Sequence, residues 1–489
     1  MSAVLAAIAE FATCRPDEIA LSDGASMLSW GDLAREVASA QHALAAALRE
    51  RPEGAPVALA LDNSTALAIA DLALIALGRP SVTLPPFFTR AQLAHAVADC
   101  GATTVLLPAT ANDKPTLSIA GARLLAAPAA SASRPIHART AKITYTSGST
   151  GKPKGVCLSL EQMETVASSV VESLGRDLAG VHMAVLPLGV LLENVAGLYV
   201  SILAGGRHHA PGLDSLGYSA GLRPDPARLA DLVERHGVTS LILAPEMLRA
   251  LTACLVAQGR RLPSLRFVAV GGARISPQLI AAARGAGLPA YEGYGLSECA
   301  SVVTLNTPTG DKVGTAGRAL PHQRITVASD GELIVHGDSF LGYVGGPPQQ
   351  GVLPTGDLGA VDLEGFVEIR GRKSNLIITD LGRNVAPEWV ESELQAQPEI
   401  GQAAVFGDGA AELCAVLTTT TPQVSDAEVA RAVARANASL PAYAHVVRWR
   451  RSPPFDAARG ELTANGRLRR EALHAAHRDF IDLQAEDAR

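Results

Sequence analysis

The chain has 489 residues, of which 48% are hydrophobic and 18% are charged, and its formal net charge is −6. This length indicates two or more domains with ample core, and the hydrophobic fraction excludes a disordered chain. No block of basic residues is present, which argues against nucleic-acid binding. The six cysteines are scattered and form no Cys-x-x-Cys pair. We therefore expect no disulfide framework, no zinc site, and a cytoplasmic location with reduced thiols.

Residues 1–19 contain Glu10 and Asp17 and lack a leading positive charge. They predict an amphipathic helix rather than a signal peptide. No apolar stretch of about 18 residues is free of charge, so we expect no membrane span. The many alanines, glycines and arginines are typical of a bacterial protein.

Strand and helix patterns alternate along the first part of the chain. The expected elements are a helix at 29–48 capped by Ser29, a strand at 56–63, a helix ending at Leu77, and strands at 80–85 and 103–107. This alternation predicts a mostly parallel sheet with helices on both faces. Residues 109–139, rich in Ala, Ser and Pro, are predicted to form a variable surface connection.

A strand expected at 141–146 is followed by a segment, 147–155, that consists only of Ser, Thr, Gly, Lys and Pro. Its glycines permit positive φ and close approach to a ligand. Successive backbone N–H groups, hydroxyls and lysines predict a concave anion site whose natural occupant is a polyphosphate. Only two residues separate Gly148 from Gly151, so this is not a Walker loop, which needs four. The alternative, a flexible linker, is disfavoured by the buried-looking strand directly before it.

This stretch resembles the phosphate loop of the adenylate-forming superfamily, which includes acyl- and aryl-CoA synthetases, adenylation domains of nonribosomal peptide synthetases and firefly luciferase. The resemblance extends over residues 5–480. It assigns nucleotide contacts in the loop to Thr146, Ser147, Gly148, Ser149, Thr150, Gly151, Lys152 and Lys154.

The resemblance implies an α/β fold with two domains. The large N-terminal domain, 1–372, would contain doubly covered, mostly parallel sheets and a small β subdomain. The C-terminal domain, 373–489, would be a small, mobile α+β unit that rotates about a hinge near Ser374.

After the loop, the pattern predicts a helix at 160–174, a strand at 184–188 and a helix at 198–204. In long-chain acyl-CoA synthetases the segment around 186–193 reads Leu-Pro-Leu-Ala-His-x-x-Glu. Here Val190 stands at the His position and Glu193 retains the acidic one. An apolar residue at 190 would make the wall of an acyl pocket more hydrophobic, although core packing explains it equally well.

Two further motifs resemble adenine-site segments of the family. Gly271, Gly272 and Ala273 follow a predicted strand and correspond to the segment that lies along the adenine.

The motif at 291–298 resembles the family's Tyr-Gly-x-Thr-Glu, with Ser297 in place of Thr. The resemblance implies that Tyr294 stacks on adenine beside Gly295, that Ser297 contacts the α-phosphate, and that Glu298 binds Mg²⁺. A hard cation does prefer such an oxygen ligand. A glycine-broken surface loop with a solvated glutamate is the alternative.

Residues 324–336 predict a hairpin around an Asp-Gly turn. Further along, the resemblance implies that Asp357 accepts both ribose hydroxyls and that Arg372 reaches the ribose or a phosphate. The loop at 381–391 would line a thiol channel after the domain rotates about Ser374.

Relatives end with Thr-x-x-Gly-Lys, and that lysine bridges carboxylate, ribose and α-phosphate in the first half-reaction. This chain carries Arg467 at the position. Both residues are cationic, but arginine is a planar fork and lysine a mobile point charge. The catalytic residues that the resemblance implies are Arg467, Lys152, Ser297 and Glu298; a surface arginine cluster is the alternative for Arg467.

The resemblance implies an AMP-forming acid–thiol ligase, such as an acyl-CoA synthetase of fatty acid metabolism, that uses ATP and Mg²⁺. The acid is expected to be hydrophobic, and the thiol to be CoA or the phosphopantetheine of a separate acyl carrier protein. An amide-forming ligase and a nucleotide-binding protein without turnover are the alternatives. We expect a monomer or homodimer.

Overall fold

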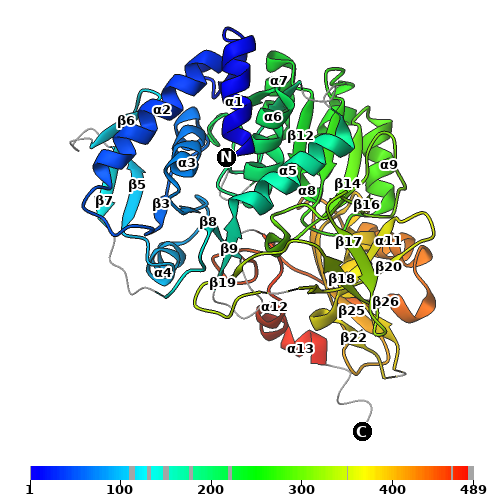
Figure 1. Cartoon of the computed structure of the whole chain (residues 1–489). Helices are drawn as coiled ribbons and strands as arrows, with labels where there is room; N and C mark the ends of the chain where they lie inside the picture. The colour runs from blue at the N-terminus through cyan, green and yellow to red at the C-terminus, as the bar shows by residue number, and fades with distance from the viewer. Residues whose placement is uncertain are drawn as a thin grey trace.

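Two large sheets form the framework of the computed structural model, the first mainly blue and cyan and the second mainly green in Figure 1. The structure describes residues 2–109, 116–128, 134–146, 153–175, 180–218, 223–349, 351–380, 382–463 and 466–482. Helices cover the sheets, and a small β sheet and a smaller domain follow. The predicted α/β class is confirmed.

The first sheet has eight strands with parallel pairs at its centre and antiparallel pairs outside. Its order is β19 (Gly342–Tyr343), β9 (Lys154–Ser159), β8 (Thr140–Thr146), β4 (Ser81–Thr83), β3 (Val57–Leu59), β5 (Thr104–Pro108), β7 (Ala122–Pro128) and β6 (Leu117–Ile119). The prediction that 109–139 is only a surface connection is therefore wrong. β6 and β7 lie in it and pair antiparallel beside β5, where backbone pairing outweighs the loop-like composition.

The second sheet has nine strands, and the six from β14 to β1 pair in parallel. Its order is β16 (Arg318–Ala319), β15 (Thr304–Leu305), β14 (Ala290–Tyr294), β13 (Phe267–Val270), β12 (Ser240–Leu243), β10 (Val181–Met183), β11 (Arg207–His209), β1 (Ile19–Ser22) and β2 (Met27–Ser29).

The strand predicted at 184–188 is wrong, because β10 ends at Met183. Beyond Met183, the side chains of Asn63 and Glu193 form the backbone hydrogen bonds that a neighbouring strand would otherwise provide. Asn63 Oδ1 accepts from Leu188 N at 2.6 Å, and Asn63 Nδ2 donates to Leu186 O at 3.2 Å. Glu193 Oε2 accepts from Leu186 N at 3.3 Å. The apolar run therefore stays buried without belonging to the sheet.

The helices of the large domain begin where the sequence places caps. Ser29 forms a capping box with Asp32 at the start of α2, and the helix predicted at 160–174 is confirmed as α5. The helical elements are α1 (Ala3–Cys14), α2 (Trp30–Ala47), α3 (Thr65–Leu77), α4 (Arg90–Asp99), α5 (Leu160–Leu174), the π-helical η2 (Glu193–Tyr199), α6 (Val200–Ala204), α7 (Pro226–His236), α8 (Pro245–Gln258), α9 (Pro277–Gly285) and the 3₁₀ turn η3 (Ser297–Cys299). No described helix combines the length and apolarity that a bilayer span requires.

A buried polar network fixes β8, the strand that precedes the glycine-rich segment. Lys142 on β8 forms an ion pair with Asp71 on α3, and both side chains are 1% exposed. Asp71 also accepts from Tyr199 OH at 2.7 Å and from Asn194 Nδ2 at 3.1 Å, both on η2. Ser81 Oγ on β4 donates to Asp71 at 3.1 Å. Asp71 thus accepts from four side chains, whereas Asn194 Oδ1 is buried without a partner among the described residues. The four hydrogen bonds tie β8, α3, β4 and η2 together.

The β subdomain is a sheet of four antiparallel strands, β17 (Arg324–Val327), β18 (Glu332–His336), β20 (Leu353–Val361) and β21 (Val367–Arg372). The predicted hairpin is confirmed as β17–β18.

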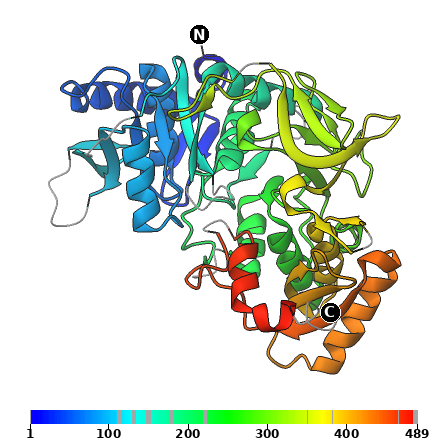
Figure 2. The same cartoon turned by 90° about the horizontal axis from the view of Figure 1, so that it is seen from below.

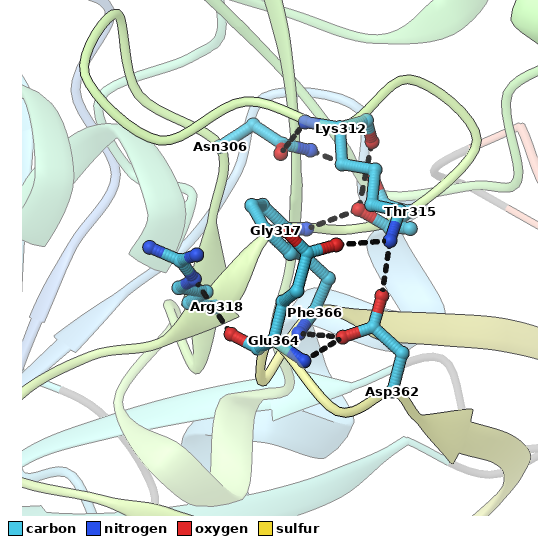
Figure 3. Close-up of polar contacts among 8 residues, drawn as sticks. All are labelled: Asn306, Lys312, Thr315, Gly317, Arg318, Asp362, Glu364 and Phe366. Carbon is cyan, nitrogen blue, oxygen red and sulfur yellow. Dashed lines mark hydrogen bonds and ion pairs between the residues drawn. The ribbon is translucent and has the colours of Figure 1, made fainter.

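A polar cluster joins the β20–β21 turn to the rest of the large domain, near Lys312 and Arg318. Figure 3 shows the Lys312 ammonium between the carboxylates of Asp362 and Glu364, each 2.6 Å away. Arg318 Nε donates to Glu364 O at 3.0 Å, and its guanidinium lies 4.3 Å from the Phe366 ring centroid. These contacts hold β20 and β21 against the end of the second sheet.

The small domain, drawn from yellow to red in Figures 1 and 2, lies at one end of the large domain. The first element after β21 is the 3₁₀ turn η4 (Lys373–Asn375). The elements that follow are β22 (Ile377–Ile378), β23 (Asn384–Val385), α10 (Pro387–Gln395), β24 (Ile400–Phe406), β25 (Leu413–Thr419), α11 (Asp426–Ala438), η5 (Ala442–Ala444), β26 (Val446–Arg451), α12 (Arg470–Ala476) and α13 (Arg478–Ile481). Arg470 at the start of α12 forms a bidentate pair with Glu391 of α10, at 2.7 and 2.8 Å. This pair anchors the chain that follows Arg467.

Candidate functional site

The described chain on both sides of the glycine-rich segment ends at one point of the first sheet. Six of the predicted loop residues, Ser147, Gly148, Ser149, Thr150, Gly151 and Lys152, lie outside the described residues. Thr146 of β8 pairs with Lys154 of β9 across the antiparallel ladder. Lys154 Nζ lies 5.5 Å from the ring centroid of Tyr343. Tyr343 therefore connects this end of the segment to its surroundings.

Glu298 lies on the other side of Tyr343. The Tyr343 hydroxyl donates to Glu298 Oε1 at 2.7 Å. The Glu298 backbone carbonyl accepts from Phe340 N at 2.6 Å and from Gln162 Nε2 at 3.2 Å. Burial and the nearby Glu298 charge raise the pKa of Tyr343, so its hydroxyl remains a donor. The predicted metal carboxylate is thus brought beside the end of the predicted phosphate loop.

The turn that carries Ser297 and Glu298 has a tight backbone. A Cβ at Gly295 would lie 1.5 Å from Ser301 O, so only glycine fits there. Ala300 and Ser301 have φ of 52° and 104°, which non-glycine residues rarely adopt. Backbone held in such regions is commonly found at functional sites. The motif's glycine is therefore a packing requirement as well as a sequence signature.

Tyr294 and Arg372 converge on Asp357. Asp357 on β20 is 4% exposed and lies opposite Arg372 on β21. The Tyr294 hydroxyl donates to Asp357 Oδ2 at 2.6 Å, and Arg372 Nε lies 2.8 Å from Oδ1. Burial raises the pKa of Asp357, and the charges of Arg372 and Arg467 together with the Tyr294 hydrogen bond oppose that rise.

Arg467 reaches the same place from the small domain. It lies in a short hairpin in which Thr463 N donates to Arg467 O at 2.7 Å and Arg467 N donates to Thr463 Oγ1 at 2.9 Å. Its side chain is accessible to solvent, yet surrounding protein and the Arg372 charge lower its pKa. The charges of Asp357 and Glu298 act in the opposite direction. Arg467 therefore stands within electrostatic reach of both carboxylates.

The segment that contains Gly271, Gly272 and Ala273 follows β13 and borders β14. Gly271 N donates to Leu243 O at 3.2 Å, and a Cβ at Gly271 would lie 3.0 Å from Gly293 O. Gly272 has φ of +87° and open space where a Cβ would stand. Because β14 ends at Tyr294, this segment lies next to the Tyr294 end of the site.

Sequence reasoning missed Tyr343, Arg274 and Glu292. Arg274 Nη1 donates to Ile369 O and thereby ties the adenine-side segment to β21. Burial raises the pKa of Glu292 to about 8, while the Arg274 charge opposes that rise. No pattern in the sequence distinguishes these residues, because each depends on segments that are distant along the chain.

Glu193, which retains the acidic position of the family segment, is fully buried on η2. Its Oε1 lies 2.8 Å from His182 Nε2 on β10. A Cβ at Gly197 would lie 2.3 Å from Glu193 Oε1, so glycine lets this pair pack against the helix. Glu193 thus braces η2 and is not among the residues that converge on Asp357.

Replacing Glu292 by glutamine should remove a pH-dependent loss of stability. An unfolded glutamate titrates near its usual pKa of ~4.3, whereas folded Glu292 titrates at about 8. Between these values unfolding releases a proton, so the free energy of unfolding falls as pH rises. In urea unfolding we expect Glu292→Gln to be the more stable protein at about pH 8.5, by at least ~1.4 kcal/mol. The difference should shrink towards pH ~5. An equal difference at both pH values would contradict the assignment.

The assembled groups suit a nucleotide with a divalent cation. An ionised carboxylate offers roughly four acceptor positions, so Asp357, with two donors, retains room for a pair of hydroxyls. Glu298 supplies an oxygen ligand of the kind that Mg²⁺ prefers. Lys154, Arg372 and Arg467 supply the positive charge that phosphates require.

Known proteins are similar in sequence to this chain. The putative fatty-acid–CoA ligase fadD11 of Mycobacterium tuberculosis is 27% identical over 422 residues, which cover 71% of this chain and 74% of that protein. The long-chain-fatty-acid–CoA ligase FadD15 of Mycobacterium bovis is 36% identical over 252 residues, 45% of this chain and 42% of FadD15. The chain thus aligns with less than half the length of FadD15.

Solved structures share the whole fold. The anthranilate CoA ligase AuaEII in complex with anthranoyl-AMP has a TM-score of 0.80 at 20% identity, covering 97% of both chains. The o-succinylbenzoate CoA synthetase of Bacillus subtilis in complex with its acyl-adenylate has a TM-score of 0.77 at 24% identity, covering 97% and 98%. At these identities the likeness establishes the fold alone.

Family models cover most of the chain. Residues 374–487 match the AMP-binding enzyme C-terminal domain. Residues 8–344, well over half of the chain, match the AMP-binding enzyme domain. The chain therefore belongs to the AMP-binding enzyme family.

Proposed function

We propose that the protein is an ATP-dependent, AMP-forming ligase that activates a hydrophobic carboxylic acid and transfers the acyl group to a thiol. The observation that carries this proposal is the geometry of two carboxylates. Tyr294 and Arg372 hold Asp357, and the Tyr343 hydroxyl holds Glu298 beside the end of the glycine-rich segment. The Arg467 charge acts on both carboxylates. Carboxylates can bind the ribose hydroxyls and the Mg²⁺ of a nucleoside triphosphate, and cations can offset the charge of its phosphates.

In this proposal the nucleotide lies between the glycine-rich segment and Asp357. Asp357 accepts the ribose hydroxyls, held in place by Tyr294 and Arg372. The Tyr294 ring and the segment from Gly271 to Ala273 flank the adenine. Glu298 holds Mg²⁺, which when bound supplies positive charge next to the phosphates.

The first step joins the acid to AMP. A substrate carboxylate oxygen attacks the α-phosphorus, and the bond from phosphorus to the pyrophosphate oxygen breaks. Because charge develops on phosphate oxygens, catalysis depends on positioning and on fixed cations. We assign those roles to Lys152, Lys154, Ser297 and Arg467.

In the second step a thiol sulfur attacks the acyl carbon, AMP leaves, and the thiol proton passes to solvent. We propose CoA as the acceptor, because relatives named as CoA ligases align with this chain. The phosphopantetheine of a separate carrier protein has the same thiol chemistry. The small domain would rotate about Ser374, in the turn Lys373–Asn375, to admit the thiol.

We propose a fatty or other hydrophobic acid as substrate. The segment Val190-Leu191-Leu192 is apolar, and Leu191 is 4% exposed. The fatty-acid ligase names of two relatives agree with this class, whereas a third relative is named 2-succinylbenzoate–CoA ligase.

The test is acid-dependent exchange between ATP and pyrophosphate across a panel of dodecanoate, benzoate and phenylalanine. We expect exchange with dodecanoate and, on adding CoA, a product with the mass of dodecanoyl-CoA. Absence of exchange with every acid would support a nucleotide-binding protein without turnover. An amide product formed on adding an amine, with none from CoA, would instead support amide formation.

Glu298→Gln should lower exchange about 30-fold, equivalent to ~2 kcal/mol of barrier, because the amide is a poorer ligand for Mg²⁺. The apparent Mg²⁺ requirement should rise, and the unfolding midpoint should stay close to that of the unaltered protein. Glu161→Gln, at a position that is 76% exposed on α5, is the control. Unchanged exchange and Mg²⁺ dependence in Glu298→Gln would remove the metal assignment.

A further inference from the structure

Arg249, on α8 of the large domain, spans the boundary to the small domain. Its Nη1 donates to Gly401 O at 3.2 Å and to Ile400 O at 3.5 Å, and its Nη2 donates to Gln395 Oε1 at 3.5 Å. All three acceptors belong to the small domain. Burial lowers the pKa of Arg249, and its Nε is buried with no hydrogen-bond partner among the described residues.

A bulge in β24 makes these carbonyls accessible. Ile400 pairs with Thr419 and Ala403 pairs with Leu417, so the register shifts between the two pairs. A bulge removes backbone groups from the ladder. Gln402 N donates instead to Thr418 Oγ1 at 2.8 Å. The Gly401 carbonyl turns to Arg249.

A second contact lies beside the first. Gln278 Nε2, on α9, donates to Glu393 Oε2, on α10, at 3.2 Å. Glu393 also accepts from Ser439 Oγ at 2.8 Å within its own domain. The carboxylate therefore keeps a partner when the domains separate.

Neither contact is an ion pair. Arg249 donates to neutral oxygens, and a neutral amide donates to Glu393. Hydrogen bonds from a charged group are stronger than those from a neutral one, and water can replace these partners when the domains separate. Of the nearby charges, Glu246 raises the pKa of Arg249 and Arg223 lowers it. The hydrogen bonds of Arg249 go instead to small-domain oxygens. This chemistry suits a contact that forms and breaks in every catalytic cycle.

The contacts of Arg249 and Gln278 bear on Arg467 because their acceptors lie in the same small domain as Arg467. Arg470, three residues after Arg467, is bound to Glu391 of α10, the helix that also carries Gln395 and Glu393. Holding α10 against α8 and α9 therefore constrains where Arg467 lies relative to Asp357 and Glu298.

We propose that Arg249 is a positioning residue for adenylate formation. It holds the small domain in the orientation that places Arg467 beside Asp357 and Glu298, and it releases that domain before thiol transfer. The inference rests on the proposed two-step ligase activity.

The experiment compares Arg249→Met with the unaltered protein in the two half-reactions separately. With the panel acid that exchanges fastest, ATP–pyrophosphate exchange should fall about tenfold through kcat, equivalent to ~1.4 kcal/mol. Thioester formation from the synthetic adenylate of that acid and CoA should be unchanged or faster. Arg249→Lys, which can still donate to one carbonyl, should recover part of the exchange.

Arg260→Met is the matched control. Arg260 follows α8 and pairs only with Asp231 and Glu234 of α7 among the described residues, both at 2.7 Å and within the large domain. Both half-reactions should keep their rates in this variant. A merely structural role of Arg249 would slow both half-reactions equally, and that result would overturn the proposal.

A readout without substrate separates this inference from the proposed function. In substrate-free protein, Arg249→Met should increase hydrogen–deuterium exchange at the start of β24 and in Lys373–Asn375, whereas Arg260→Met should not. If the unaltered protein shows no acid-dependent exchange, the proposed function fails on that result alone. Unchanged deuterium uptake in Arg249→Met would overturn the positioning role whatever the activity.

Discussion

Replacing Lys142 by methionine should lower the free energy of unfolding by about 3–5 kcal/mol, because it leaves Asp71 as an unpaired charge in the core. Both side chains are 1% exposed, so water cannot take the place of the lost ammonium. Burial alone would raise the pKa of Asp71, but the Lys142 charge and the hydrogen bonds outweigh it and lower the pKa. Denaturant unfolding at neutral pH measures the loss.

The double variant Lys142→Met/Asp71→Asn distinguishes an ion pair from general core damage. Removing both charges should destabilise the protein by clearly less than the two single losses summed. Lys312→Met is the control, since this half-exposed lysine pairs with two carboxylates, whereas buried Lys142 pairs with one. Lys312→Met should destabilise the protein far less than Lys142→Met, because solvent screens an exposed ion pair. Additive losses in the double variant would contradict the ion-pair account.

The lowered pKa of Asp71 also sets a direction with pH. A carboxylate whose folded pKa lies below its unfolded value stabilises the protein above the unfolded pKa, ~3.9 for aspartate. That contribution disappears as pH falls through the folded pKa. As the pH of the unaltered protein falls through the folded pKa of Asp71, protonation of this carboxylate should therefore weaken the connection that it makes between β8 and η2.

Arg467→Ala should lower acid-dependent ATP–pyrophosphate exchange about 100-fold, equivalent to ~2.7 kcal/mol of barrier. In the proposed mechanism its guanidinium offsets charge on the α-phosphate, and its charge interacts with those of Asp357 and Glu298. The loss should appear in kcat, because the charge it offsets develops in the transition state.

Two companion variants sharpen this test. Arg469→Ala, two residues further on and exposed, should leave exchange unchanged. Arg467→Lys should retain most of the exchange if a point charge suffices, and less if the planar fork is required. Unchanged exchange in Arg467→Ala would show that this arginine does not take the role of the family lysine.

The amino-acid sequence was sufficient to predict the class of fold and the family. Local signals were sufficient for this: caps such as Ser29, the Asp-Gly hairpin, and strands that alternate with helices. The family motifs also named Glu298, Tyr294, Asp357 and Arg372, which the structure brings together. Their roles in binding and catalysis stay predictions.

Sequence reasoning failed where backbone pairing or long-range contacts override local composition. The loop-like run at 109–139 contains β6 and β7 because an open sheet edge was present to pair with. The apolar run at 184–188 is no strand because Asn63 satisfies its backbone from a distant turn.

How the two domains meet could be seen only in the folded protein. It placed Arg467 within reach of Asp357 and Glu298, and it brought Arg249 to the bulge at Gly401. These contacts join residues more than a hundred positions apart, and their geometry follows from how α8, α10 and the β subdomain pack. Local propensity carries no information about such distances, so the orientation that the proposed chemistry needs is a property of packing.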